Sequence, residues 1–439
     1  MAPNQMKVTC PACSLLCDDI VVKLDEHQQS MKVIANGCAK SIQFFEQTVT
    51  DSKPTINGNP VDLNTAINKA AEILKLANQP LIAGLGTEVQ GMRAIMHLAD
   101  KTGATLDHMH SDATMRNTLV LQNSGWQTTT LTEVKNRVDL LLVIGTDIVS
   151  SLPQFFERII WNESTLFEQD TSTREVIYLG GGKGLDTSAG NSPNGTQPSV
   201  INCENAQLPE VIATLNALIN GKNLTTDKIA GINLVDLQSI ADRLKCAKYS
   251  VITWASSAFK FGHSELLVQA ITECVRTLNT GSFKFSTRSA GLPLTSGDGD
   301  SSVSNVATWM SGYPLRSSFK RGYPEYNPYE FTTEKLLSNN EADLLIWISS
   351  FKPVAPSPNS LANHKLPVIV IGHPNMQFEQ QPDVFIPVRI LGLQEKGLMF
   401  RMDSSVTLPL TQIMNSNLPS LSDVCTQIEL ALNNHESGK

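Results

Sequence analysis

Short, continuously apolar runs that alternate with amphipathic segments are the feature that most constrains the fold of this 439-residue chain. Apolar residues at three- and four-residue steps predict helices, and the uninterrupted runs predict strands. Strands that are apolar throughout are typical of parallel sheets with both faces covered by helices. The sequence therefore predicts an α/β protein. The expected strands are 81–84, 140–144, 176–179, 251–254, 344–348 and 368–371, and the main expected helices are 62–77, 88–101, 208–219 and 265–278.

The composition and charge of the chain exclude several classes of protein. The formal net charge is −8, with 41% apolar and 17% charged residues. An acidic chain lacks the basic surface that neutralises phosphates, so we expect no nucleic-acid partner. No run approaches the roughly 18–20 apolar residues that span a bilayer, and residues 1–8 lack the apolar stretch of a signal peptide. We therefore expect a cytoplasmic protein without a membrane partner.

Changes in the residue pattern predict three regions. Residues 1–55 are expected to form a small N-terminal unit with short alternating strands, which ends at a turn over 54–58. Residues 56–185 are expected to form a first α/β lobe, and residues 186–439 a second α/β region. The stretch 186–199 is rich in Ser, Gly, Asn and Pro, so it either separates the two lobes or is a loop within one site. The stretch 296–305 has a similar composition and is also predicted to be a loop.

The strongest local signal is the spacing of the cysteines near the N-terminus. Cys10, Cys13 and Cys17 lie close together, and Cys38 follows after a gap of twenty residues. Three close cysteines and one distant cysteine can converge on one iron–sulfur (4Fe–4S) cluster, so these four residues are its predicted ligands. A tetrahedral zinc site and four reduced thiols left from an ancestral site are the alternatives. The remaining cysteines occur singly and are predicted to be small buried hydrophobic residues. They are Cys203, Cys246, Cys274 and Cys425.

Several longer blocks resemble the B subunits of formylmethanofuran dehydrogenases. The first is the cysteine segment itself, Cys13-Ser14-Leu15-Leu16-Cys17-Asp18-Asp19-Ile20, and Cys38 is followed by a lysine, Lys40, as is common in molybdopterin oxidoreductases. These blocks run in the family's order from residue 10 to about residue 403, so the resemblance covers nearly the whole chain. The other blocks are Asn305-Val306-Ala307-Thr308-Trp309-Met310-Ser311-Gly312-Tyr313-Pro314, Arg321-Gly322-Tyr323-Pro324-Glu325-Tyr326-Asn327-Pro328, Asp383-Val384-Phe385-Ile386-Pro387-Val388 and Phe400-Arg401-Met402-Asp403.

This resemblance implies a molybdopterin-oxidoreductase-like scaffold of parallel-sheet lobes. In the archaeal enzymes that the chain resembles, a cysteine or selenocysteine of the first lobe ligates tungsten or molybdenum held by two pterin cofactors. In methylotrophic bacteria, relatives of this subunit belong to the formyltransferase/hydrolase complex. That complex passes a formyl group from tetrahydromethanopterin to a furan-type carrier and releases it as formate, without a redox step, and its chemistry resides in partner subunits.

The segment expected to carry the metal ligand contains no cysteine. It follows Gly103 and reads His108-Met109-His110-Ser111-Asp112-Ala113-Thr114-Met115-Arg116-Asn117, and no cysteine occurs between Cys38 and Cys203. A soft metal centre of this type favours a thiolate or selenolate. The tungsten or molybdenum pterin site is therefore predicted to be absent. His108 and His110 are interpreted as part of a polar turn, and a replacement metal pair would need a third ligand that the sequence does not assign.

Two loops that would meet the cofactor also depart from the family. After the strand 140–144 the resemblance implies Gly-(Ser/Thr)-Asn-Pro, whereas this chain has Gly145-Thr146-Asp147-Ile148. Asp147 would place a carboxylate beside an anionic cofactor, which is unfavourable at close range. Gly180-Gly181-Gly182-Lys183 follows the strand 176–179, and its amides could cradle a phosphate. A flexible turn is the favoured interpretation of this glycine run.

The block 305–329 includes an aromatic and proline-rich stretch, from Tyr313 to Tyr329, that contains no base–nucleophile pair. This stretch is predicted to form either a contact with another subunit or a loop that packs against one lobe.

Together these features predict a scaffold subunit, not itself catalytic, of the formyltransferase/hydrolase complex in tetrahydromethanopterin-linked conversion of formaldehyde to formate. The expected partners are the hydrolase, formyltransferase and C-type subunits, and indirectly a furan-type carrier. One alternative is a catalytically active tungsten- or molybdenum-dependent formylmethanofuran dehydrogenase subunit. Another is a module that binds the furan carrier in the vacated pterin cleft.

Overall fold

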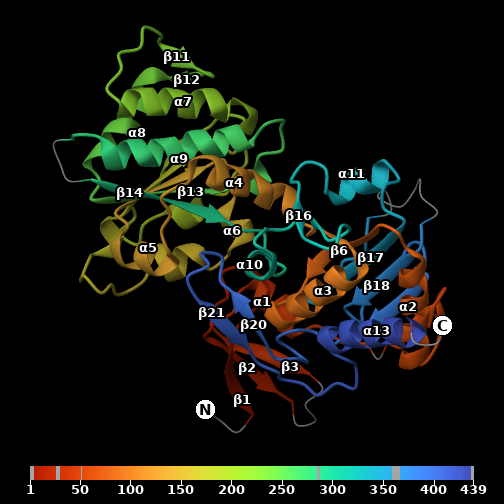
Figure 1. Ribbon diagram of the computed structural model, residues 1–439. Coiled ribbons are helices and arrows are strands. Elements are labelled where there is room, and N and C mark those ends of the chain that lie inside the picture. The colour runs from red at the N-terminus through yellow and green to blue at the C-terminus, as the bar shows by residue number, and fades with distance from the viewer. Residues whose placement is uncertain (1–3, 26–29, 51, 284–286, 358–365, 437–439) are drawn as a thin grey trace. The chain divides into compact units, whose positions relative to one another are not determined.

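The computed structural model describes residues 4–25, 30–50, 52–283, 287–357 and 366–436 (Figure 1). The chain forms two compact units, of which the second is inserted into the first. The first unit contains Met1–Ser111, Gly297–Arg401 and Val406–Lys439, and the second contains Asp112–Ser296 and Met402–Ser405. This division differs from the three regions expected from the sequence, because strands on both sides of residues 185 and 186 join one sheet.

The second unit is built on a five-stranded sheet in which every neighbouring pair is parallel. Its middle strand is buried along its whole length, which explains why its sequence is apolar throughout. The stretch 186–199 lies between two strands of this sheet and is therefore an internal loop of the unit. In spatial order the strands are β10 (Ser199–Ile201), β9 (Glu175–Leu179), β8 (Leu140–Ile144), β13 (Tyr249–Ala255) and β14 (Arg288–Leu294).

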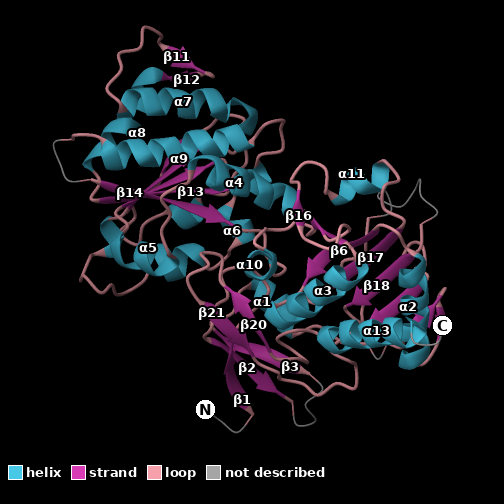
Figure 2. Cartoon of the chain, in the orientation of Figure 1, coloured by secondary structure: helices cyan, strands magenta, loops and turns pink. Residues whose placement is uncertain are grey.

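Helices cover both faces of this sheet (Figure 2). The helices of this unit are α4 (Ser111–Ser124), α5 (Leu131–Arg137), α6 (Ile148–Ser151), α7 (Leu208–Ile219), α8 (Leu234–Cys246) and α9 (Glu265–Thr280), with a π-helical turn at Phe156–Ile160. Three of them, α7, α8 and α9, share one hydrophobic core with the strands, and α5 lies on the opposite face. Short 3₁₀ turns occur at Thr171–Thr173, Ser188–Gly190, Asn205–Gln207 and Ser256–Ala258, and a ribbon of β11 (Lys228–Ile229) and β12 (Ile232–Asn233) joins α7 to α8.

The first unit contains a nine-stranded mixed sheet. Its five central strands are parallel, and the short strands at both edges pair antiparallel. The predicted turn over 54–58 is confirmed at Asn57 and Gly58, the tip of an edge hairpin, but is wrong at Thr55 and Ile56, which form a strand of that hairpin. In spatial order the strands are β16 (Glu325–Tyr326), β15 (Ser317–Ser318), β7 (Thr105–Leu106), β6 (Pro80–Gly86), β17 (Leu344–Ser349), β18 (Val368–Gly372), β19 (Val384–Pro387), β4 (Thr55–Ile56) and β5 (Asn59–Pro60).

Four helices of the first unit share the largest hydrophobic core with this sheet. They are α2 (Leu63–Leu76), α3 (Val89–Thr102), α10 (Asp300–Ser311) and α13 (Leu421–Glu436), and a fifth helix, α11 (Thr333–Ser338), packs into a separate core. The prediction of a loop at 296–305 is wrong from Asp300 onward. There the chain is helical, because Val303, Val306 and Ala307 lie at helical spacing and are buried in this core.

The N-terminal residues form a three-stranded antiparallel sheet of β1 (Gln5–Val8), β2 (Ile20–Leu24) and β3 (Met31–Ala35), followed by α1 (Ala39–Phe45). This sheet shares its core with Ile390, Leu393 and Ile413. A hairpin of β20 (Gly397–Phe400) and β21 (Thr407–Leu410) lies between Leu393 and Ile413 in the chain. The N-terminal region is therefore stabilised by segments from the far end of the sequence.

The prediction that the four single cysteines are buried is confirmed for Cys203, Cys274 and Cys425. It is wrong for Cys246, which is exposed where it ends α8. No helix in the described part of the chain combines the length and apolarity that crossing a membrane requires.

Candidate metal site

The structure brings the four N-terminal cysteines together. Cys10, Cys13 and Cys17 lie on the loop that joins β1 to β2, and the amide of Cys10 donates to the carbonyl of Cys17 at 2.9 Å. Cys38 immediately precedes α1, and its amide donates to the Ser41 hydroxyl at 2.7 Å. All eight cysteines of the chain lie among the described residues, and none forms a disulfide.

Burial keeps the Cys10 and Cys13 thiols protonated in the absence of a metal. Burial raises the pKa of the Cys10 thiol well above its usual value, and the neighbouring Cys13, Cys17 and Cys38 raise it further. Burial likewise raises the pKa of Cys13, whereas the ammonium groups of Lys40 and Lys352 lower it. These two thiols become favourable as thiolates only when a cation binds them.

The four thiols, as they lie, do not form a site for a single metal ion. In the described ranges, no group of three or more His, Cys, Asp or Glu side chains is arranged to hold one metal ion. A zinc ion needs all four sulfurs at about 2.3 Å from one centre. In a four-iron cluster each thiolate binds a different iron, so the four sulfurs can lie farther apart.

The segment 108–117, which the resemblance assigns to the metal ligand, begins as a tight turn after β7 and continues as the first residues of α4. His108 is only 2% exposed, and its ring Nδ1 accepts a hydrogen bond from the amide of His110 at 3.0 Å. Burial, followed by the proximity of His110, lowers the pKa of His108 to about 3, so its imidazole is neutral. The polar-turn interpretation is confirmed, and Met109 between the two histidines provides a thioether but no thiolate.

The histidine turn is fixed by Asp298, a residue that sequence reasoning missed. The Asp298 carboxylate contacts His110 Nε2 at 3.1 Å and Lys352 Nζ at 2.7 Å. Burial opposes ionisation of Asp298, but the hydrogen bond from His110 and the charge of Lys352 outweigh it and lower the pKa to about 2. Asp298 has a φ of 53°. The only sequence signal for this strained position is its place between two glycines, Gly297 and Gly299.

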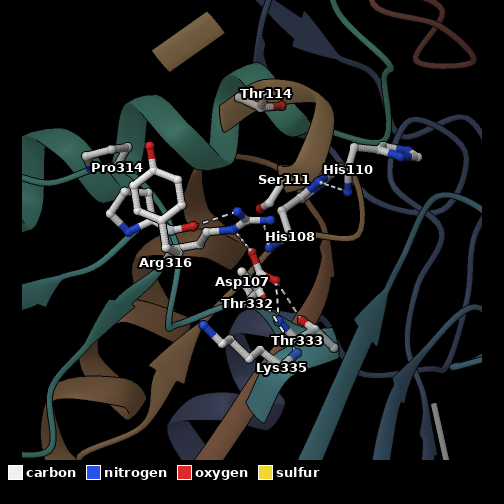
Figure 3. A network of polar contacts seen from close by, with 12 residues as sticks. Asp107, His108, His110, Ser111, Thr114, Pro314, Arg316, Thr332, Thr333 and Lys335 are labelled. Atoms are coloured by element: carbon white, nitrogen blue, oxygen red, sulfur yellow. Dashed lines mark hydrogen bonds and ion pairs between the residues drawn. The ribbon is translucent and has the colours of Figure 1, made fainter. Parts of the chain in front are cut away.

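A second network anchors the start of the same turn (Figure 3). The side chains of Asp107 and Arg316 are 4% and 7% exposed and form an ion pair at 3.4 Å. Asp107 also accepts hydrogen bonds from the amide and hydroxyl of Thr333 at 2.7 and 2.8 Å, and Arg316 donates to the Pro328 carbonyl at 2.7 Å. The network therefore fixes the block that contains Arg316 and Pro328 to the turn at residue 107.

In the second unit, the glycine turn after β9 has its amides occupied by the protein. The amide of Gly180 donates to the Ile201 carbonyl at 2.9 Å, and that of Gly182 donates to the Cys203 carbonyl at 3.0 Å. The amide of Gly181 donates to Asn205 Oδ1 at 3.0 Å. These three amides are not available to a phosphate. The interpretation of this glycine run as a turn is supported. The turn is held by these three hydrogen bonds and is not the flexible turn that we expected.

Side chains of the following segment pack closely against two glycines of this turn. A methyl group on Gly180 would lie 2.8 Å from a methyl carbon of Leu208, and one on Gly182 would lie 3.3 Å from the Glu204 carboxylate. Asp147 accepts hydrogen bonds from the amide and hydroxyl of Ser150 at 3.0 and 2.6 Å and so caps α6. The carboxylate of Asp147 therefore has a local structural role.

No family model matches the chain. Comparison with known proteins finds relatives that align with most of it. The chain is 27% identical over 413 residues to the B subunit of the tungsten-containing formylmethanofuran dehydrogenase 2 of Methanocaldococcus jannaschii, and the match covers 90% of this chain and 91% of that protein. It is 26% identical over 316 residues to the B subunit of the formyltransferase/hydrolase complex Fhc of Methylorubrum extorquens, covering 69% of this chain and 75% of that protein.

Solved structures confirm the predicted fold. A chain in the crystal structure of the formyltransferase/hydrolase complex (FhcABCD) from Methylorubrum extorquens in complex with methylofuran matches with a TM-score of 0.73 and 23% identity, over 88% of this chain and 99% of that chain. Acetylene hydratase from Pelobacter acetylenicus matches with a TM-score of 0.65 and 12% identity, over 98% of this chain and 69% of that chain. The protein thus has the α/β scaffold of molybdopterin oxidoreductases and is a relative of the B subunits of formylmethanofuran dehydrogenases and of the formyltransferase/hydrolase complex.

Proposed function

We propose that the chain is the B-type scaffold subunit of a formyltransferase/hydrolase complex and has no tungsten or molybdenum site of its own. The observation that carries the proposal is the turn between β7 and α4. His108, Met109 and His110 begin the segment where the resemblance places a metal-binding thiolate, and the rings of His108 and His110 contact the carbonyl and the carboxylate of Asp298 at 3.3 and 3.1 Å. A soft metal centre held by pterins favours a thiolate that this turn does not contain.

The glycine turn of the second unit supports the same proposal. A pterin dinucleotide carries phosphates, and phosphates in α/β proteins bind to free amides at glycine-rich turns. The amides of Gly180, Gly181 and Gly182 are all engaged by protein oxygens. The residues at this turn therefore do not fit that part of the cofactor.

In this proposal the formyl chemistry belongs to partner subunits. A formyl group would pass from tetrahydromethanopterin to a furan-type carrier in a formyltransferase subunit, and a hydrolase subunit would release it as formate. The B-type chain would hold these subunits and a C-type subunit in one assembly. The relatives are named as subunits of such enzymes, which supports an assembly role.

We also propose that Cys10, Cys13, Cys17 and Cys38 hold one 4Fe–4S cluster. Such a cluster supplies one-electron transfer where a redox reaction takes place, and otherwise stabilises the region that holds it. The grouping of four thiols beside a small sheet supports this assignment.

The second candidate function is an active tungsten-dependent dehydrogenase subunit. The relative named as tungsten-containing aligns over 90% of this chain, whereas the relative from the Fhc complex aligns over 69%. Such an enzyme would need to bind its metal without a thiolate at the turn 107–110.

Co-expression with hydrolase, formyltransferase and C-type subunits separates the two functions. A scaffold is expected to co-purify with the other subunits, to be required for their stable assembly, and to give a complex that hydrolyses the formyl carrier without reducing a redox dye. Formate- or formyl-dependent dye reduction by the purified complex would favour the dehydrogenase. A chain that remains a soluble monomer and does not bind the other subunits would contradict the scaffold role.

A further inference from the structure

The loop Gly297–Gly299 lies against the cysteine loop. Its three residues have φ values of 101°, 53° and 81°, all in the left-handed region. A methyl group on Gly297 would lie 3.9 Å from the Cα of Cys13 and from the amide nitrogen of Ser14. Because the two backbones approach so closely, Asp298 is held next to the cysteine site.

Asp298 in turn holds Lys352, which follows β17 in the sequence. The ammonium nitrogen of Lys352 lies 2.7 Å from Asp298 Oδ1, and the Asp298 side chain is only 10% exposed. Since the pKa of Asp298 is lowered to about 2, its carboxylate stays ionised at physiological pH and the ion pair persists. Through Asp298, the ammonium group of Lys352 is thus held beside the loop that contains Cys13.

An iron–sulfur cluster bound by four thiolates is an anion, and burying an anion is unfavourable unless positive charge or hydrogen-bond donors compensate it. Lys40 lies two residues after a predicted ligand, whereas Lys352 comes from a segment more than 300 residues away in the chain. The cysteine site thus has positive charge from two separate segments.

We propose that Lys352 compensates the charge of the cluster at Cys10, Cys13, Cys17 and Cys38, and that Asp298 positions its ammonium group. The inference rests on the cluster assigned in the proposed function. A fixed cation stabilises the reduced cluster more than the oxidised one, because the reduced form carries one more negative charge. Lys352 therefore raises the reduction potential of the cluster.

The test is a potentiometric titration, monitored by electron paramagnetic resonance, of the full chain in its complex after anaerobic reconstitution with iron and sulfide. Lys352→Met should lower the midpoint potential of the cluster. At the parent midpoint, the ratio of reduced to oxidised cluster should fall about threefold, which corresponds to a decrease of about 30 mV for a one-electron couple. The effect is modest because 41% of the Lys352 side chain is exposed and solvent screens its charge. Lys352→Arg should retain the parent midpoint, and so should Lys69→Met, which removes a surface lysine of α2.

In an Asp298→Asn background, Lys352→Met should shift the midpoint by less than it does in the parent, because the ammonium group is no longer positioned by the carboxylate. Asparagine tolerates the left-handed backbone of this position, so the loop should keep its conformation. Equal midpoints in the parent and Lys352→Met would overturn the inference and leave the cluster assignment intact. An equal shift by Lys352→Met in the parent and in the Asp298→Asn background would overturn the positioning role of Asp298. A parent that binds no iron would remove the cluster and this inference, but not the scaffold role.

Discussion

The side-chain oxygen of Asn205 accepts a hydrogen bond from the backbone amide of Gly181 at 3.0 Å. The amide nitrogen of the same side chain donates to the carbonyls of Gly145 and Ala258 at 2.9 and 3.2 Å. One asparagine thus joins the ends of three neighbouring strands, in the place where a doubly wound sheet usually binds its ligand. This part of the second unit is closed by the protein's own polar groups.

We expect Asn205→Ala to destabilise the protein by about 1–3 kcal/mol, since it leaves one amide and two carbonyls without their partner. The free energy of unfolding can be measured by urea denaturation monitored by circular dichroism. Asn223→Ala is the matched control, because Asn223 is exposed on a loop of the same unit. An Asn205→Ala variant as stable as the control would show that these hydrogen bonds do not close the site.

Breaking the buried ion pair of Asp107 and Arg316 should lower the free energy of unfolding more than Asn205→Ala does. Asp107→Ala leaves the Arg316 guanidinium buried without a counter-charge, which typically costs about 3–5 kcal/mol. The double variant Asp107→Ala/Arg316→Met should be more stable than the single variant, because no unpaired charge remains. Glu133→Ala, which removes a surface pair with Arg137, should change stability by less than about 1 kcal/mol. Thermal unfolding of the four proteins would test this order, and additive losses in the double variant would contradict it.

Much of the architecture could be predicted because local patterns determine it. The strand 140–144 and the helix 208–219 have the predicted bounds, and Asp62 and Gly103 mark helix ends through ordinary capping chemistry. The order of strands could not be predicted, because an apolar strand does not specify its neighbour. The insertion of the second unit into the first was therefore missed.

The candidate site was predictable only where its residues lie close in sequence. The spacing of Cys10, Cys13 and Cys17 indicated a shared site, and the structure groups them with Cys38. The contacts of Asp298 with His110 and Lys352 join three distant segments, so no local pattern reveals them. They depend on how the strand ends are arranged in the folded sheet.

Cys13→Ser tests the cluster assignment. If the cluster is present, the variant should lose the broad thiolate-to-iron absorption of an anaerobic preparation, and the N-terminal sheet should unfold at a lower temperature, because metal binding contributes to the folding of so small a unit. Cys246→Ser should behave like the parent, since Cys246 is exposed and distant in sequence from the site. Four titratable thiols at the N-terminus, no iron, and a Cys13→Ser variant that melts like the parent would show that the cysteines are vestigial.

Glu395 should contribute a loss of stability as the pH rises from about 4.5 to about 7. Burial, followed by the charge of Glu88, raises the pKa of Glu395 from 4.5 to about 7. In this range the Glu395 side chain keeps a proton in the folded state that it has lost in the unfolded state, so its contribution to stability decreases with pH. Glu395→Gln should remove this contribution and stabilise the protein by about 1 kcal/mol at pH 8, allowing for partial exposure of the group.

Glu72→Gln is the control for the pH measurement, because the Glu72 side chain is 59% exposed on α2. The pH dependence of its unfolding free energy should match that of the parent. If Glu395→Gln also follows the parent from pH 4.5 to pH 8, Glu395 does not retain its proton in the folded state.

The central claim is that the chain has no tungsten or molybdenum site of its own. The most direct measurement is elemental analysis of the intact complex, purified from cells grown with both tungstate and molybdate, together with a fluorescence assay for released pterin. We predict far less than one atom of either metal per chain and no pterin, because the turn at His108–His110 has no thiolate and the Gly180–Gly182 amides are occupied. About one tungsten or molybdenum atom per chain, with pterin, would contradict the account.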